Sequence, residues 1–232
     1  MQAQAKPGYL SLLSVASLLL LASALQAHDL SGENAEFVKN LAGPAPGPFL
    51  YLGAKHMITG FDHLLFLLGV VFFLYRGRDV ILYVTLFTLG HSLTLLLGVV
   101  LGWQVNPYLI DTVIGLSVVY KAFENMGGFR EAMGITLDTR WIVFAFGLCH
   151  GLGLAARLQS YINPGEGLYT NLFSFNVGVE LGQIAALIII LLLLQQWRAR
   201  RGFQHQAFYA NAALMLAGFV LAGTQFAGYM GV

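Results

Sequence analysis

One segment of the chain reads His56-Met-Ile-Thr-Gly-Phe-Asp62-His63, and it continues as Leu64-Leu-Phe-Leu-Leu-Gly-Val-Val-Phe-Phe-Leu-Tyr75. Its length and apolar character are typical of a helix that crosses a lipid bilayer. An ionisable side chain near the centre of such a helix costs roughly 2.5 to 3.5 kcal/mol, so His56, Asp62 and His63 are expected to have a role there. Two imidazole nitrogens and one carboxylate oxygen form a ligand set that suits a divalent transition metal.

The composition of the whole chain also indicates a membrane protein. Of its 232 residues, 57% are hydrophobic and only 10% are charged, and the mean hydropathy is +0.71. The formal net charge of +1 offers no electrostatic basis for binding nucleic acid. The sequence therefore predicts an all-α, polytopic membrane protein whose surroundings are the lipid bilayer, with no nucleic-acid partner.

Several segments are suitable membrane-spanning helices, each of which needs about 20 mostly apolar residues. Polar residues, glycines and prolines separate them. We expect about six transmembrane helices, at residues 50–75, 80–102, 107–125, 141–159, 169–195 and 207–229. Together they would form one transmembrane domain over residues 49–232.

The residues before this domain predict a leader and a short connection. Residues 1–27 have the pattern of a cleavable signal peptide, and residues 28–48 predict a short periplasmic lead-in. Cleavage after Ala24 fits the small-x-small rule, whereas cleavage after Ala27 would make His28 the new N-terminus. An N-terminal His28 is either a chelating group for metal or a solvated tail residue, and an uncleaved leader would be a seventh span.

The distribution of arginine predicts the orientation in the membrane. The loops that contain Arg76, Arg130 and Arg198 are basic, whereas the alternate loops around Asn106 and Asn163 contain no basic residue. Basic loops are retained on the cytoplasmic side. We therefore expect a multi-pass protein of the bacterial inner (cytoplasmic) membrane with a periplasmic mature N-terminus.

The spacing of His56 and His63 leaves two arrangements open. Seven residues advance a helix by about 10 Å and turn it by about 700°, so the two side chains share a face but not an ion. Either they form two successive metal stations, or the helix breaks at Thr59-Gly60 and brings them together, as half-helices do in transporters.

Further ionisable residues lie in the middle of later spans. His91 is in the second, His150 in the fourth and Glu180 about eleven residues into the fifth. Counting about 1.5 Å per residue places all three level with Asp62 and His63. We expect one metal-binding cluster from four helices, because each group alone would carry a burial cost. Taken singly, His91 or His150 is equally consistent with an interhelical hydrogen bond.

Glycine spacing favours close packing around two of these residues. His150 lies within a Gly-x3-Gly pattern at residues 147–151, and Glu180 lies within another at residues 178–182. Such patterns allow membrane helices to approach closely. Close backbones would bring the polar side chains within reach of one another.

A few other polar residues are candidates for supporting roles. Ser92, Thr94 and Asn176 are expected either to orient the imidazoles or to form ordinary interhelical hydrogen bonds. Glu124, with Lys121, is either part of an exit site on the pathway or an interfacial cluster whose charged ends reach the membrane surface.

Four segments in order resemble those of the HupE/UreJ family, and the last three look like its second branch. The resemblance covers most of the chain from about residue 50 to 195. The segments are His56–His63, Phe87–Leu95, Ser117–Asn125 and Phe146–Gly153.

This resemblance implies a secondary nickel permease, with cobalt as cargo in some members, linked to hydrogenase and urease maturation. By position it implicates a set of five ligand or pathway residues. They are His56, Asp62, His63, Glu124 and His150. Met57 stands where the first branch has a proline, which leaves the metal open. Metalloenzyme maturation proteins are partners implied by the resemblance alone.

Together these observations predict a permease, not an enzyme, for secondary uptake of a divalent transition metal across the inner membrane. Ni²⁺ is the expected cargo, with Co²⁺, Cu²⁺ and Zn²⁺ as alternatives, and no permanently bound cofactor is expected. The sequence contains no Walker motif for ATP. The alternatives are a membrane-embedded metalloenzyme and a metal-sensing accessory subunit.

Overall fold

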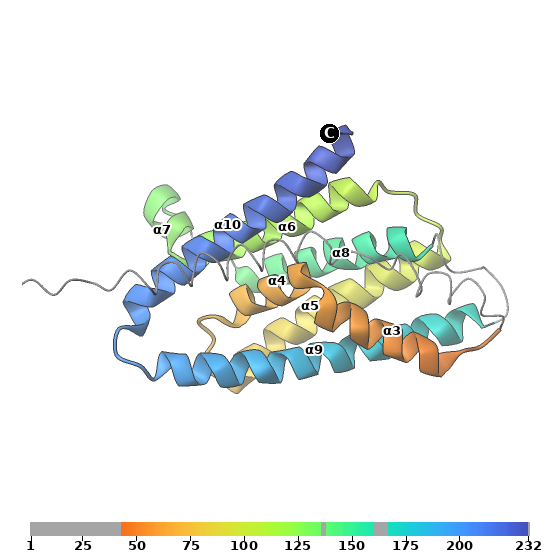
Figure 1. The fold of residues 1–232 in the computed structure, drawn as a ribbon, viewed down its shortest axis with the longest axis horizontal. Coiled ribbons are helices and arrows are strands. Elements are labelled where there is room, and N and C mark those ends of the chain that lie inside the picture. The colour runs from red at the N-terminus through yellow and green to blue at the C-terminus, as the bar shows by residue number, and fades with distance from the viewer. Residues whose placement is uncertain (1–42, 136–137, 160–166, 232) are drawn as a thin grey trace, which may run out of the picture.

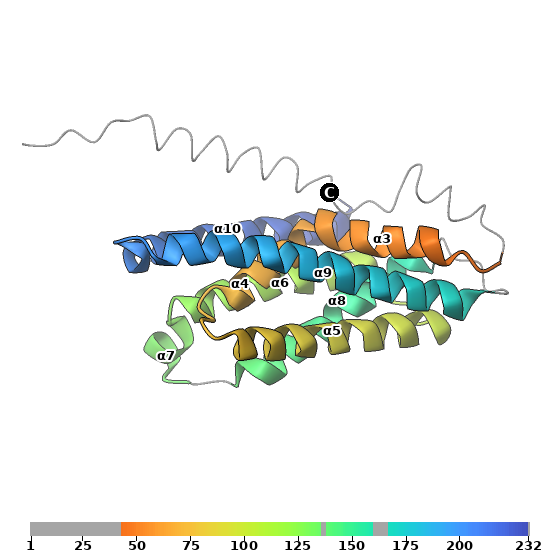
Figure 2. The ribbon, with the colours of Figure 1, turned by 90° about the horizontal axis from the view of Figure 1, so that it is seen from below.

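The computed structural model describes residues 43–135, 138–159 and 167–231. Within these ranges the chain is helical and contains no strand. Figures 1 and 2 show a bundle of long helices with the short α7 at one end. The helices are α3 (Pro46–Thr59), α4 (Phe61–Val71), α5 (Gly77–Val100), α6 (Pro107–Asn125), α7 (Gly128–Met133), α8 (Thr139–Leu158), α9 (Leu168–Arg198) and α10 (Phe203–Met230).

Each expected span corresponds to one long helix, except the first, which is two helices. Four helices are long and apolar enough to cross a membrane, namely α5, α8, α9 and α10, and α3 with α4 is a fifth candidate if the bent pair is one span. The helix α6 has 19 residues and includes Asp111, Lys121 and Glu124. The structure therefore supports a multi-pass membrane protein with four or five candidate spans, and the number six stays a prediction.

The first span is broken at Gly60, where α3 and α4 meet at a bend of 63°. Gly60 has extended backbone angles, φ −74° and ψ 95°, which interrupt the helix. A Cβ atom there would lie 3.0 Å from the His56 carbonyl oxygen and 3.0 Å from the His63 ring nitrogen Nδ1, so a side chain would crowd both. Of the two arrangements left open by the spacing, the broken helix is confirmed.

Glycine allows α3 and α9 to pack with their backbones in contact. A Cβ atom on Gly53 or Gly178 would lie 2.0 Å from a carbonyl oxygen of the other helix, that of Phe175 or Leu50. The contacts advance in the same direction along both helices, since Met57 lies beside Gly182. The two helices are therefore parallel, as expected for the first and fifth spans.

The helices α5 and α8 form a second parallel pair of the same kind. A Cβ atom on Gly147 would lie 2.4 Å from the Phe87 carbonyl oxygen, and one on Gly151 would lie 2.0 Å from that of His91. The third pair, α6 and α10, is antiparallel, with Gly115 against Ala222. The short α4 contacts α6, α10, α9 and α5 and so lies at the centre of the bundle.

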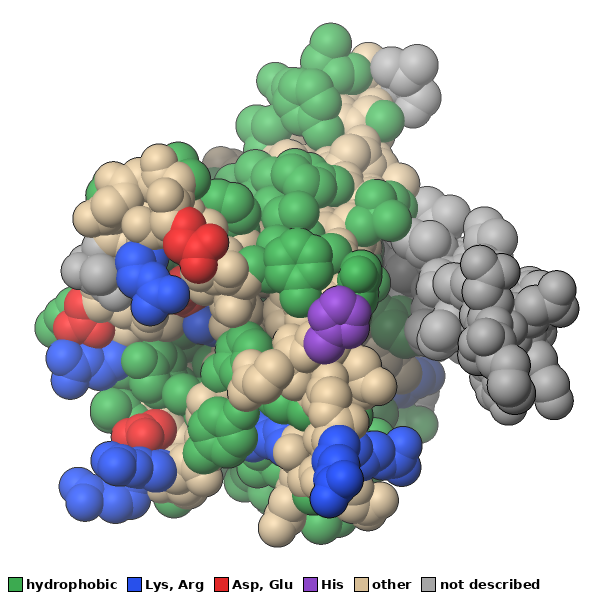
Figure 3. All heavy atoms as spheres, turned by 90° about the vertical axis from the view of Figure 1, so that its left-hand side faces the viewer, with side chains coloured by type: hydrophobic (Ala, Val, Ile, Leu, Met, Phe, Trp, Pro, Cys, Tyr) green, Lys and Arg blue, Asp and Glu red, His purple; other side chains and the backbone are tan. Residues whose placement is uncertain are grey.

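Basic side chains gather at one end of the bundle, where α5, α8 and α10 begin. Figure 3 views this face and shows most of its Lys and Arg side chains around the rim. We call it the basic end; α3, α6 and α9 begin at the opposite end. The arginines that are exposed on the loops and helix ends here are Arg76, Arg78, Arg130, Arg140, Arg200 and Arg201.

The predicted signal peptide, with His28 just after it, lies outside the described residues.

Hydrogen bonds join the start of α3 to α9. Helix α3 begins at Pro46, so it starts inside the expected lead-in, and proline suits the first turn of a helix. The Asn171 side-chain oxygen accepts a hydrogen bond from the Ala45 amide at 2.7 Å, and its NH₂ group donates to the Gly43 carbonyl at 3.1 Å.

Candidate metal centre

Asp62 and His63 lie in the first turn of α4, directly after the break at Gly60. Both are buried, with 4% and 3% of their surface exposed. The partial positive charge of a helix N-terminus favours a carboxylate at this position. The Asp62 carboxylate Oδ1 lies 3.0 Å from His63 Nδ1. An ionised Asp62 holds the proton on Nδ1, which leaves Nε2 of His63 as the nitrogen with a lone pair for a metal.

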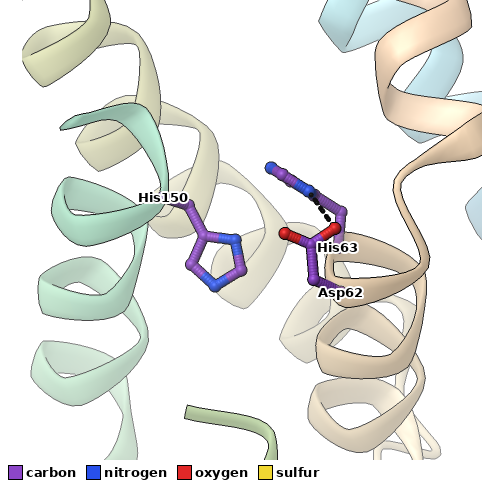
Figure 4. A group of neighbouring side chains, drawn as sticks. All are labelled: Asp62, His63 and His150. Atoms are coloured by element: carbon purple, nitrogen blue, oxygen red, sulfur yellow. Dashed lines mark hydrogen bonds and ion pairs between the residues drawn. The ribbon is translucent and has the colours of Figure 1, made fainter. Parts of the chain in front are cut away.

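His150 approaches this pair from α8 and is fully buried. Its ring centroid lies 4.8 Å from that of His63. Figure 4 shows the His150 ring extending from α8 toward Asp62 and His63 on α4. One potential ligand atom from each of the three side chains can be chosen so that all lie within 4.8 Å of one another. The three residues therefore form the candidate metal centre.

Ser117 on α6 orients the His150 ring. Its hydroxyl donates to the Ile114 carbonyl at 2.6 Å, and the same oxygen lies 3.2 Å from His150 Nε2. A hydroxyl has only one proton, so this oxygen accepts from the Nε2–H group of His150. Nδ1 of His150 is then the nitrogen with a lone pair. His63 and His150 thus each have one ring nitrogen held by a polar neighbour and the other suited to bind metal.

The geometry fits an ion after small side-chain movements. A tetrahedral metal at about 2.1 Å from each ligand separates the ligand atoms by about 3.4 Å. One ligand atom can be chosen from each side chain so that all three lie within 4.8 Å of one another, and shifts of about an ångström would bring such a set onto one ion. Among the described residues, the buried Nε2 of His63 has no hydrogen-bond partner, as expected for a metal ligand.

His56 and His91 lie next to the centre without joining the three-residue group. Their ring centroids are 5.1 and 5.8 Å from that of His63. His91 is 1% exposed, and neither of its ring nitrogens has a hydrogen-bond partner within the described part of the chain. Four histidines from four helices therefore surround the start of α4, with His63 in contact with the other three.

Aromatic rings and a small cavity complete the surroundings. The rings of Phe66 and Phe87 lie 5.2 and 5.1 Å from that of His150 and provide an apolar wall. A cavity of about 20 Å³, enough for about one water molecule, adjoins the centre. Its lining includes His56, Asp62, His63, His150, Asp111 and Arg157.

The structure does not bring Glu180 to this cluster, contrary to the expectation from its depth. Glu180 is exposed on α9, and so are its neighbours Leu181 and Ile184. Gly178 and Gly182 face α3, and a residue two positions from each points about 200° away around the helix. A residue's depth along α9 does not fix the direction in which its side chain points.

The expected supporting residues have separate positions. The Thr94 hydroxyl donates to the Leu148 carbonyl at 2.7 Å and so joins α5 to α8 without holding a ring. Asn176 donates to the Leu172 carbonyl within α9 at 3.2 Å. Ser92 is half-buried on α5. The hydroxyl that does hold an imidazole is that of Ser117, which only the proximity of α6 to α8 could identify.

Glu124 lies near the basic end of the bundle, away from the histidines. Its carboxylate accepts a hydrogen bond from Lys121 at 2.6 Å and another from the Thr139 hydroxyl. This links the last turn of α6 to the first turn of α8. Among the described residues it is an ion-paired group near the end of α6.

Sequence reasoning also missed a polar contact between α5 and α9. The Thr88 hydroxyl oxygen lies 3.0 Å from the side-chain oxygen of Gln183 and joins the two helices. Gln183 is 2% exposed. An uncharged side chain gives little sequence signal in a membrane span, so only the helix packing reveals the contact.

These features define a multi-pass helical membrane protein with a buried histidine and aspartate group that could hold a metal ion. The model of the HupE / UreJ protein family matches residues 32–231. The chain therefore belongs to the HupE/UreJ family, a transporter-type family linked to nickel and cobalt transport. No curated protein and no solved structure matched the chain.

Proposed function

We propose that this protein is a secondary permease that carries a divalent transition metal, Ni²⁺ in the first place, from the periplasm into the cytoplasm. The observation that best supports this is the buried group of Asp62, His63 and His150 inside a helical bundle. Imidazole and carboxylate ligands also accept Co²⁺, Cu²⁺ and Zn²⁺, which are the alternative cargoes. The metal is cargo and not a resident cofactor.

The basic end of the bundle faces the cytoplasm in this proposal, because basic loops are retained on that side. The opposite end, where α3, α6 and α9 begin, then faces the periplasm. Metal would enter from the opposite end and leave at the basic end. The membrane potential is a sufficient driving force, since it contributes about 2.3 kcal/mol per charge per 100 mV and the cargo has two charges.

The chain's own residues suggest an order of contacts. His56, in the last turn of α3, would meet the ion first, and the bend at Gly60 would let the His63 ring take it over at a centroid distance of 5.1 Å. His63, Asp62 and His150 would then hold it against the apolar wall. Protonation of the imidazoles would release it, because protons compete with metal for the same nitrogen. Glu124 offers a carboxylate near the exit.

Uptake by the purified protein in liposomes tests this function. The His63→Ala variant should lose Ni²⁺ uptake by more than the roughly 10- to 100-fold that loss of an outer-shell partner costs. A metal-sensitive dye inside the liposomes measures the rate. The matched control is His205→Ala, which removes an exposed histidine whose ring has an edge contact with that of Tyr209 within α10, and it should transport normally.

The same experiment separates the alternatives. A wild-type protein that binds Ni²⁺ tightly but moves none would be a sensor, an accessory subunit or an enzyme instead of a permease. Normal uptake by the His63→Ala variant would place the transport site elsewhere.

A further inference from the structure

An ion pair lines the cavity on the side away from the basic end. Asp111, in the second turn of α6, accepts a hydrogen bond from the Arg157 guanidinium near the end of α8. Arg157 follows His150 by seven residues, which places it about 10 Å nearer the opposite end on almost the same face of α8. His150, Leu154 and Arg157 all line the cavity, so α8 connects the metal centre with this pair.

The two side chains differ in exposure. The Asp111 side chain is 4% exposed, whereas that of Arg157 is 27% exposed. Gly153 makes the close approach possible, because a Cβ atom there would lie only 3.3 Å from the Asp111 carboxylate. The guanidinium therefore lies between a buried carboxylate and the surroundings of the bundle.

Arg157 therefore holds a positive charge against the Asp111 carboxylate, and both residues line the cavity. While Arg157 stays in place, its positive charge neutralises Asp111 and repels an arriving dication. A dication that reaches the carboxylate interacts with it more strongly than a single positive charge does, so it can take the place of the guanidinium.

We propose that Asp111 and Arg157 form the outer gate of the metal centre: an entering divalent cation displaces Arg157 from Asp111, and Arg157 returns once the ion has moved on to the histidines. The gate rests on the proposed function. It adds Asp111 to the residues of the cation pathway. Arg157 is then the positive group that pairs with Asp111 whenever no metal ion is bound there.

A double variant that keeps the net charge tests this gate. D111N/R157Q replaces the ion pair with two amides of similar size, which pair more weakly. Stopped-flow mixing of purified protein with Ni²⁺ should show association and dissociation both faster by about fivefold or more, with the equilibrium affinity nearly unchanged. A gate outside the binding site alters both rates together, whereas a ligand alters the affinity.

The two single variants should differ in their effect on the association rate. D111N removes the negative charge opposite Arg157 and keeps the positive one at the entrance, so it should slow association by about tenfold, while R157Q should not slow it. The matched control is D138N/R140Q, which removes the exposed ion pair at the start of the same helix α8. It should leave both rates as in the wild type.

The outcomes separate the gate from the proposed function. If the wild type binds and transports Ni²⁺ but D111N/R157Q exchanges metal no faster, or melts at a lower temperature with slower exchange, the pair is a permanent clamp between α6 and α8 and the gate is refuted. If the wild type transports no metal but the double variant exchanges it faster, Asp111 and Arg157 control access to the metal centre and the permease is refuted.

Discussion

In α8, His150 lies inside a Gly-x3-Gly frame at residues 147–151, and in α9, Glu180 lies inside the same frame at residues 178–182. His150 is fully buried and belongs to the candidate metal centre, whereas Glu180 is exposed on the surface of the bundle. Both glycine frames pack against a neighbouring helix with near-contact of the backbones. The local pattern is the same, but the polar residue is buried in α8 and exposed in α9.

The difference is one of rotation. A residue three positions after the first glycine lies about 80° from the centre of the glycine face, whereas one two positions after it lies about 180° away. His150 has the first position and can reach the interior between α4, α5 and α6. Glu180 has the second and points away from α3. A glycine frame therefore locates the packed face of a helix, and the register within the frame decides which residues share it.

Replacing His150 and replacing Glu180 should give the largest difference in Ni²⁺ affinity between the two frames. His150→Ala should lower the Ni²⁺ affinity of the purified protein by roughly 100-fold or more, because it removes one of three ligands and not an outer-shell partner. Glu180→Gln should stay within about twofold of the wild type, as surface substitutions usually do. Isothermal titration calorimetry measures both. Equal losses would mean that the exposed face of α9 takes part in metal binding.

Adding a methyl group to each frame should affect stability alike but metal binding differently. Gly151→Ala and Gly178→Ala each place a Cβ atom 2.0 Å from a carbonyl oxygen, of His91 or Leu50. Overpacking of this kind typically costs about 1–3 kcal/mol, so both should lower the melting temperature in detergent. Only Gly151→Ala should also weaken Ni²⁺ binding, since it displaces α8 against His91.

The control for this pair is Gly223→Ala on α10, where an added Cβ atom meets nothing within 4 Å. Its melting temperature should not fall. A loss of Ni²⁺ affinity in Gly178→Ala as large as in Gly151→Ala would show that the two frames do not act independently.

The smallest expected contrast concerns the polar neighbours of the two frames. Ser117→Ala removes the hydroxyl 3.2 Å from His150 Nε2 and should lower Ni²⁺ affinity about 10-fold, the lower end for an outer-shell partner. Asn176→Ala removes an amide that bonds only within α9 among the hydrogen bonds described, and should leave the affinity unchanged. Ser117→Thr keeps a hydroxyl and should recover part of the loss. Binding titrations at fixed pH provide the comparison.

Much of the fold could be predicted because hydropathy is a local property of the chain. The expected segment 107–125 coincides with α6, and the expected 80–102 differs from α5 by only a few residues at each end. The break in the first span was one of two readings of the same spacing, and Gly60 decided between them. The number of true membrane crossings depends on whether α3 and α4 form one span, and on α6, whose charged residues Asp111, Lys121 and Glu124 make it less apolar than the other long helices.

The candidate site could be predicted in part. Asp62, His63 and His150 were expected together because ionisable residues at equal depth in membrane helices share their burial cost. The pairing of Asp111 with Arg157 in the cavity wall was not predicted. A contact between residues on different helices produces no pattern in either segment of sequence, so it could not be predicted.

The order of amino acids by itself determined the class of protein, the approximate extent of the helices and the identity of the residues that can bind metal. Tertiary structure alone decided which of them meet. Depth along a helix follows from counting residues at about 1.5 Å each, but rotation about the axis matters only relative to a neighbour. The bend at Gly60 and the register of the glycine frames set that rotation, so His63 faces His150 while Glu180 faces outward.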